Sequence, residues 1–158
     1  MSLSFWTIAA RLGLAILCGA LLGWERELQR KPAGLRTHMM VALGAAAFTL
    51  VTLNLTYTDL KTGDELAPVD PARTIAGVIG GIGFLGAGTI IQSRGSVEGI
   101  TTAAAIWVMG AIGVACGIGN YTLAATTTGL ALLILSGVGW VEARMRKIAR
   151  ANGPGDDE

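Results

Sequence analysis

The sequence predicts an all-α membrane protein, a bundle of about five transmembrane helices, on the basis of its composition and of how its charges are distributed. The 158-residue chain is 52% hydrophobic and 15% charged, with a mean hydropathy of +0.57. The charged residues are gathered into short blocks that separate long, nearly uncharged stretches. Several membrane spans produce this pattern, whereas a water-soluble domain carries charges throughout its surface.

Five apolar stretches are long enough to cross a membrane. A helix rises about 1.5 Å per residue, so about 20 apolar residues cross a hydrocarbon core about 30 Å thick. These stretches lack the alternation of barrel strands, and open sheets leave backbone groups that lipid cannot satisfy, so each stretch is predicted to be a helix. The expected spans, within a transmembrane domain of residues 1–141, are 5–24, 38–57, 71–91, 101–118 and 121–141.

The connections between the spans predict the orientation, because basic residues are retained in the cytoplasm. The connections on one side of the membrane carry nearly all the basic residues, and those on the other side carry only Lys61, in a connection that is otherwise acidic. We therefore expect the N-terminus outside and the C-terminus in the cytoplasm, where residues 142–158 form a short basic and then acidic tail. Nine basic residues fall on the cytoplasmic side: Arg26, Arg30, Lys31, Arg36, Arg94, Arg144, Arg146, Lys147 and Arg150.

The third span is unusually rich in glycine. Its GIGFLG segment fits the G-x-G-x-x-G fingerprint, but a dinucleotide site also needs a preceding strand and a βαβ unit, and here the glycines lie inside an apolar span. Each glycine costs a helix about 1 kcal/mol relative to alanine. Either this span is the crowded centre of the bundle, or it is partly unwound where it faces protein or water. The expected packing glycines are Gly77, Gly80, Gly81, Gly83, Gly86 and Gly88.

Three long motifs follow one another along the chain: GWERELQRKPAGLRTHMMVALGAAAF, DPARTIAGVIGGIGFLGAGTI and GITTAAAIWVMGAIGVACGIGNY. Through these motifs, which cover most of residues 19–121, the chain resembles the MgtC/SapB family of bacterial membrane proteins. The resemblance implies a five-span inner-membrane protein associated with growth at low magnesium and, in pathogens, with survival inside host cells. Longer members carry a soluble domain after the fifth span, and because this chain stops at Glu158 we expect the membrane unit to act without it.

Four polar residues are candidates for a functional site near the outer face: Asp70, Arg73, Arg11 and Asn54. Ionisable groups within a membrane are costly, so each is a functional candidate. In one interpretation Asp70 caps its helix and pairs with Arg73, while Arg11 reaches the surface. In the other, the four line an outward-facing cavity that binds an ion or couples to the proton path of a partner.

A second set of polar residues is expected at the inner face. His38 is the only histidine, and it either hydrogen-bonds a loop or acts as a pH switch. Thr37 is predicted to cap the second helix, and Arg36 to pair with Glu25 or to face lipid phosphates. The full set is Glu25, Arg36, Thr37, His38, Glu98, Thr101 and Thr102.

The sequence excludes several function classes. A net charge of +1 without basic patches among aromatic residues does not fit nucleic-acid binding. Cys18 and Cys116 fall in different spans without partners, and no set of residues has catalytic or metal-ligand spacing. We expect no enzyme activity, no cofactor, no metal site and no nucleotide.

The predicted function follows from these points and from the resemblance together. We expect a multi-pass protein of the bacterial inner membrane that supports adaptation to low magnesium by regulating another integral membrane protein, such as the ATP synthase or a transporter. The alternative is a small oligomeric transporter or channel for magnesium or another ion or solute, in which two or more subunits build the path. In either case the bilayer is a partner, and a homo-oligomer is compatible with both.

Overall fold

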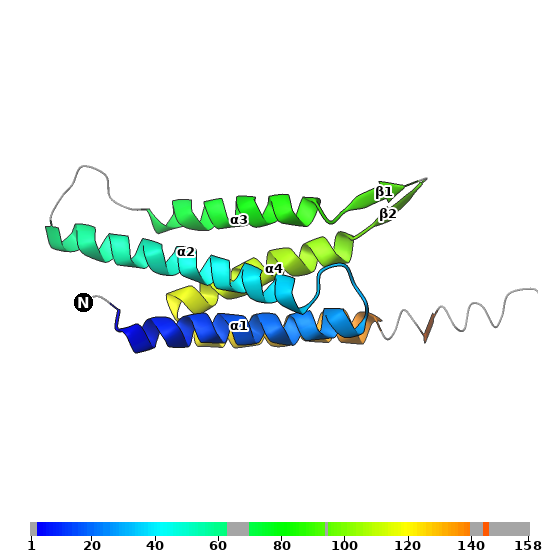
Figure 1. Cartoon of the computed structure of the whole chain (residues 1–158), viewed down its shortest axis with the longest axis horizontal. Helices are drawn as coiled ribbons and strands as arrows, with labels where there is room; N and C mark the ends of the chain where they lie inside the picture. The colour runs from blue at the N-terminus through cyan, green and yellow to red at the C-terminus, as the bar shows by residue number, and fades with distance from the viewer. Residues whose placement is uncertain (1–2, 63–69, 94, 140–143, 146–158) are drawn as a thin grey trace, which may run out of the picture.

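The protein is a bundle of five helices with one small β-hairpin (Figure 1). The structure, a computed structural model, describes residues 3–62, 70–93, 95–139 and 144–145. The predicted tail at 142–158 therefore lies outside the described residues, apart from Arg144 and Met145. In chain order the elements are α1 (Phe5–Leu28), α2 (Leu35–Thr62), α3 (Pro71–Ala87), β1 (Ile91–Ser93), β2 (Ser96–Glu98), α4 (Ile100–Ile118), α5 (Tyr121–Leu133) and a π-helical turn, η1 (Ile134–Val138).

Four of the helices are long and apolar enough to cross a membrane, which confirms the predicted class of helical membrane bundle. The third helix, α3, has 17 residues and is a shorter apolar helix. Its predicted end at residue 91 is wrong, because the chain leaves the helix after Ala87 and the Thr89 hydroxyl donates to the Gly86 carbonyl oxygen at 2.7 Å. That α3 crosses the bilayer as a fifth span stays a prediction.

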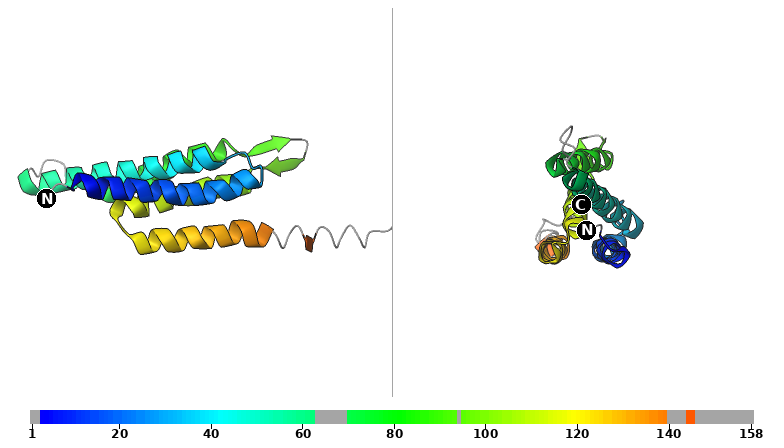
Figure 2. Two further views of the ribbon diagram at one scale, coloured as in Figure 1. Left: turned by 60° about the horizontal axis from the view of Figure 1, so that its bottom comes forward. Right: turned by 90° about the vertical axis from the view of Figure 1, so that its left-hand side faces the viewer.

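The helix α4 lies in the middle of the bundle when the molecule is viewed along its long axis (Figure 2). The most extensive contacts join α1 to α2 and α2 to α4, while α3 packs on α2 and α4, and α5 packs on α4 and α1. The buried core lies between α1, α2 and α4. It consists largely of small and medium side chains, including Ala15, Leu22, Ala42, Ala46, Met109, Ile112 and Ala115.

The β-hairpin between α3 and α4 was not predicted. Its two antiparallel strands pair Ile91 with Glu98 and Ser93 with Ser96, and they project beyond the end of the bundle (Figure 1). Gly95 has a φ of 88°, which suits the tight turn of a short hairpin. Strands of three residues are too short to show an alternating hydrophobic pattern, so periodicity could not reveal them.

Glycine pairs allow the backbones of the central helices to approach closely. A Cβ added at Gly19 would lie 2.8 Å from the His38 carbonyl oxygen, and one at Gly23 would lie 2.6 Å from Leu35 Cα. On the other side of α2, a Cβ at Gly113 would lie 2.5 Å from the Ala42 carbonyl oxygen. The crowded centre is therefore the contact of α2 with α1 and α4.

The prediction that the α3 glycines form the crowded or unwound part of the bundle is wrong for this chain. The helix α3 is regular, and a Cβ added at Gly77, Gly80, Gly81 or Gly83 would meet nothing within 4 Å. Only Gly86 approaches another helix, with its added Cβ 3.4 Å from the Ala103 carbonyl oxygen, while Gly88 meets the end of its own helix. Most α3 glycines face away from the core because Ile82 and Gly86 provide its buried contacts.

The glycine contacts give a test of this packing. The substitution Gly113→Ala places a methyl group against the backbone of α2, so we expect it to lower the free energy of unfolding by about 1 to 3 kcal/mol. The matched control is Gly129→Ala on α5, where an added Cβ meets nothing within 4 Å. That change should be neutral or stabilise by up to about 1 kcal/mol. Thermal unfolding followed by circular dichroism in detergent measures both, and equal melting temperatures for the two variants would contradict the packing.

Candidate functional site

Three buried polar side chains occupy the end of the bundle next to the connection between α1 and α2. Arg26 is 2% exposed, Thr102 is 2% exposed and His38 is 0% exposed. The Arg26 Nη2 atom donates to Thr102 Oγ1 at 3.0 Å, which joins the last turn of α1 to the first turn of α4. We call Arg26, His38 and Thr102, together with the neighbouring Glu25, the inner polar cluster.

His38 is held in one orientation by the loop before α2. Its Nδ1 atom lies 3.0 Å from the Gly34 carbonyl oxygen, and because a carbonyl only accepts, a neutral His38 carries its proton on Nδ1. The Nε2 atom then presents a lone pair to the protein interior, and in the described part of the chain it has no hydrogen-bond partner. The His38 ring also lies within electrostatic range of Arg26.

Arg26 is the member of this cluster that the sequence analysis missed as a site residue. It had been counted only as a basic residue of the cytoplasmic connection. A helical signal was present, because Gly19, Leu22 and Arg26 follow one another at intervals of three and four residues and share the buried face of α1. A basic residue at helical spacing from the buried residues of the same face is the pattern that could have identified Arg26.

Glu25 is half-buried and does not pair with Arg36. Its Oε1 atom accepts a hydrogen bond from the Gln29 side chain, and its Oε2 atom has no partner within the described residues. Arg36 is exposed. The predicted pair of Glu25 with Arg36 is therefore not formed.

The other members of the predicted inner set lie at the surface: Thr37, Glu98 and Thr101 are exposed. The predicted cap at Thr37 is wrong, because α2 begins two residues earlier at Leu35, whose N–H donates to Glu27 Oε2 at 3.0 Å. Of the predicted set, the structure brings together His38 and Thr102, with Glu25 at the edge.

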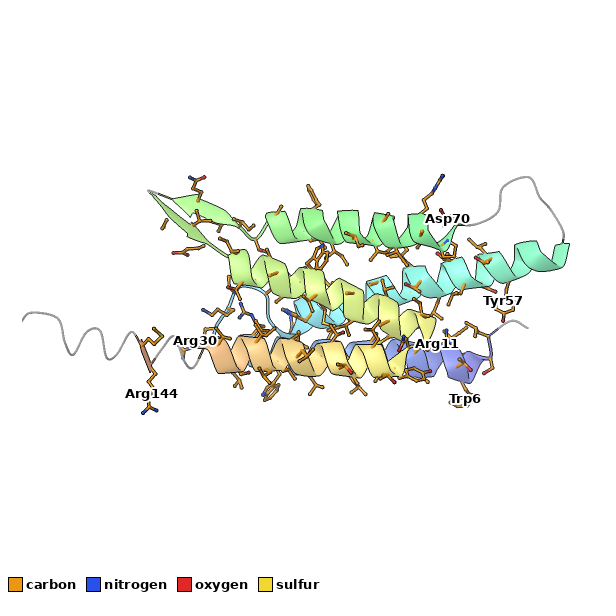
Figure 3. All side chains as sticks on the ribbon, turned by 180° about the vertical axis from the view of Figure 1, so that it is seen from behind. Trp6, Arg11, Arg30, Tyr57, Asp70 and Arg144 are labelled. Carbon is orange, nitrogen blue, oxygen red and sulfur yellow. The ribbon has the colours of Figure 1, made fainter. Side chains whose placement is uncertain are left out.

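The outer candidates do not form a common cavity. Asp70 is exposed and accepts a hydrogen bond from the Ala72 N–H at 2.9 Å, as expected of a helix cap. Arg73 is also exposed, and within the described residues it makes no ion pair with Asp70. Figure 3 shows Asp70 and Arg11 on different sides of the bundle, and Asn54 is exposed on α2. The interpretation of a shared outward-facing cavity is not supported by this arrangement.

Arg11 instead holds the end of α4. Its Nη1 atom donates to the Gly117 carbonyl oxygen at 2.8 Å, and its guanidinium packs on Gly119, where the chain turns with a φ of 90°. The last carbonyls of a helix have no intrahelical partner and carry a partial negative charge, so a cation stabilises them. The position of Arg11 within the first span is thus explained by a structural contact.

The described residues do not supply the ligand set of a metal site. They contain no group of three or more histidine, cysteine or acidic side chains that could hold a metal ion. Cys18 and Cys116 are both buried in the same core between α1 and α4, where their thiol groups lie close enough to interact with each other. The inner polar cluster is therefore the candidate site.

Comparison with known proteins places the chain among bacterial membrane proteins. The MgtC family pattern matches residues 12–144. YhiD of Escherichia coli is 42% identical over 77% of this chain and 55% of YhiD, and the protein MgtC of Brucella abortus is 42% identical over 76% of this chain and 46% of that protein. The protein SrpB of Synechococcus elongatus is 39% identical over 90% of this chain and 78% of SrpB. No solved structure matches.

The chain thus spans about half the length of YhiD and MgtC. The match nevertheless extends through all five helices, including the inner polar cluster and the α3 glycines. Together with the apolar helices, it makes this a multi-pass bacterial membrane protein. The chain belongs to the MgtC family.

Proposed function

We propose that the protein acts without enzyme activity, by binding a transmembrane helix of another membrane protein during adaptation to low magnesium. Membership of the MgtC family, in which the name of the relative YhiD includes the word magnesium, supports the link to magnesium. The single observation that carries the binding role is an open apolar groove between α2 and α3, on the side of the bundle away from α1 and α5.

The groove has the shape that a helix needs. It has a volume of about 620 Å³, and each wall presents one row of residues spaced four apart. On α2 the row is Met40, Gly44 and Phe48; on α3 it is Gly77, Gly81 and Leu85. Rows with this spacing form the ridges and grooves by which helices interlock, and glycine in the row lets a partner backbone come close.

These glycines make no close helix contact with the described residues of the chain. A Cβ added at Gly44, Gly77 or Gly81 would meet nothing within 4 Å, whereas glycines of the central contact would collide with backbone atoms. Since each glycine weakens a helix by about 1 kcal/mol, an open row of them costs stability without an internal benefit. A partner helix packed on them would supply that benefit, and in lipid such contacts are the main source of helix association.

The interior of the single chain favours binding over transport. Its core between α1, α2 and α4 is apolar, and the described buried polar groups are confined to one end, as in the inner polar cluster, or bonded to backbone carbonyls, as with Thr49 and Thr128. A path for an ion needs oxygen ligands or water along its length. In the described part of one chain the buried side-chain oxygens do not form a line along the bundle.

Site-specific crosslinking tests the groove. A photoreactive aromatic residue in place of Phe48, which is 64% exposed on the groove, should crosslink to one integral membrane protein in magnesium-starved cells. The matched control is the same residue in place of Leu130, which is 56% exposed on α5. Adding Gly81→Leu should abolish the crosslink and growth at low magnesium while leaving the melting temperature unchanged.

The comparison variant for this loss is Gly129→Leu, which also adds a side chain where nothing lies within 4 Å but on α5. It should retain both the crosslink and growth. Full growth with Gly81→Leu, or an equal crosslink from positions 48 and 130, would refute the groove as the binding surface.

Transport by an oligomer is the second candidate, because the name of the relative YhiD includes the words magnesium transporter. Purified protein reconstituted in liposomes containing a magnesium-sensitive dye distinguishes the two. We expect no magnesium entry above that of empty liposomes. Reproducible entry that Gly81→Leu abolishes would favour the transporter and would assign the groove to subunit contacts.

The proposed orientation places the α1–α2 connection, and with it the inner polar cluster, at the cytoplasmic face. The exposed basic residues Arg30, Lys31 and Arg36 of this end support it. A reporter fused after Glu158 that is active only in the cytoplasm should be active, and one fused before Met1 should be inactive. The reverse pattern would place the cluster at the outer face.

A further inference from the structure

The inner polar cluster holds a buried positive charge that forms no ion pair among the described residues. Arg26 is 2% exposed, yet its only hydrogen bond in the described structure goes to the uncharged Thr102 hydroxyl. Its Nε atom is buried without a hydrogen-bond partner among the described residues, and the Glu25 carboxylate lies within electrostatic range of the guanidinium but forms no ion pair with it in the described structure. Burying a charge in this way is costly, because the guanidinium loses its hydration and gains no ion pair in return.

A second source of positive potential lies directly beside this guanidinium. The first N–H groups of a helix lack intrahelical partners and carry a partial positive charge. The helix α4 has 19 residues and begins at Ile100, and its N-cap residue, Gly99, has a φ of 90° and provides no side-chain cap; the first turn contains no acidic residue. Its first backbone hydrogen bond runs from the Ala103 N–H to the Gly99 carbonyl, so the preceding N–H groups remain outside the helical ladder.

The other helix starts show that this arrangement is specific to α4. Ser4, Asp70 and Asn120 cap α1, α3 and α5 with side-chain oxygens, and Glu27 accepts from the first N–H of α2. At the start of α4 no side-chain oxygen caps the helix. The nearby Arg26 guanidinium cannot replace it, because it can only donate hydrogen bonds. A cation pointing at an uncapped helix start is unfavourable on its own and favourable with an anion between the two.

We propose that this place binds a phosphate group, held by the Arg26 guanidinium, the Thr102 hydroxyl and the first N–H groups of α4. A phosphate offers several acceptor oxygens, which suits both the planar fork of an arginine and the N–H groups of a helix start. The first turn of α4 reaches the bundle surface, where Ile100 is 58% exposed and Thr101 is exposed, while Arg26 and Thr102 lie beneath it and are each 2% exposed. The site does not depend on the α2–α3 groove.

A phosphate group at the end of a membrane bundle comes from one of two sources, the headgroup of a phospholipid or free inorganic phosphate. Arg26 lies in the last turn of α1, and this is the depth at which lipid phosphates meet a protein. Glu25 is the internal competitor. Its Oε2 atom is buried and unpartnered next to Arg26 in sequence, so it is the nearest group that could take the place of the anion.

The test uses the purified full-length protein in two arms. In the first, inorganic phosphate is titrated in detergent at constant ionic strength, with chloride as reference, and the rise in melting temperature gives an affinity. In the second, the protein is taken from nanodiscs of phosphatidylglycerol or of a phosphate-free glycolipid, and native mass spectrometry counts retained lipids. Either arm alone, if positive, supports the phosphate site and identifies its source.

The variants localise the effect. Arg26→Gln should weaken binding at least about tenfold, since a hydrogen bond to a charged group contributes that much, and Thr102→Val should weaken it several-fold. Glu25→Gln, which removes the competing carboxylate, should bind more tightly than the wild type. The matched control is Lys31→Gln, which removes one exposed positive charge from the same end and should leave binding unchanged.

Three results would overturn the proposal: no phosphate-dependent shift together with no preference for the phospholipid, wild-type binding by Arg26→Gln, or an equal loss with Lys31→Gln. If Arg26→Gln does not fold, Thr102→Val and Glu25→Gln decide, and wild-type binding by both would refute the site. None of these measurements involves a protein partner, so the site can fail while the groove stands, and the groove can fail while the site stands.

Discussion

The close approach of α2 to both α1 and α4 is the constraint on which the rest of this structure depends. Lipid is as apolar as a leucine side chain, so helices in a bilayer gain little from burying apolar surface and associate mainly through packing. Here Gly19 and Gly23 on one side, and Gly113 and Gly117 on the other, remove the side chains that would separate the backbones. The core of alanine, cysteine and medium-sized side chains fits only because this distance is short.

The same contact explains why polar groups are buried at one end. Arg26 follows Gly19 and Gly23 on one face of α1, so the contact that packs the glycines also carries its guanidinium against α4 and away from water. His38 begins the face of α2 that packs on Gly19. As a result the Arg26 charge is buried, and Arg26 Nε and His38 Nε2 have no hydrogen-bond partner among the described residues. Apolar side chains at these two positions would cost less free energy of folding. An arrangement that weakens the fold in this way is better explained by a ligand than by packing.

The third helix, α3, packs much less closely than α1, α2 and α4. It contacts α2 and α4 along one edge and leaves most of its glycines facing outward, so its open face contributes nothing to the stability of the chain. Close packing is concentrated in α1, α2 and α4, and the surfaces proposed for binding are the groove between α2 and α3 and the start of α4. This division lets a substitution such as one at Gly81 affect recognition while the bundle stays folded.

Composition and charge blocks were sufficient to predict a helical membrane bundle and the places of its helices, because span length and the exclusion of charge are properties of each segment alone. A local signal also identified the helix cap at Asp70, since a cap depends only on neighbouring residues. Only the tertiary structure decided which glycines are crowded, because G-x-x-x-G spacing does not say which face of a helix meets a neighbour. The tertiary structure also showed that Arg11 lies apart from Asp70 and that Arg26 contacts Thr102, 76 positions away in the chain. A buried contact between helices depends on how the helices are rotated and how closely they approach, and no single segment encodes either.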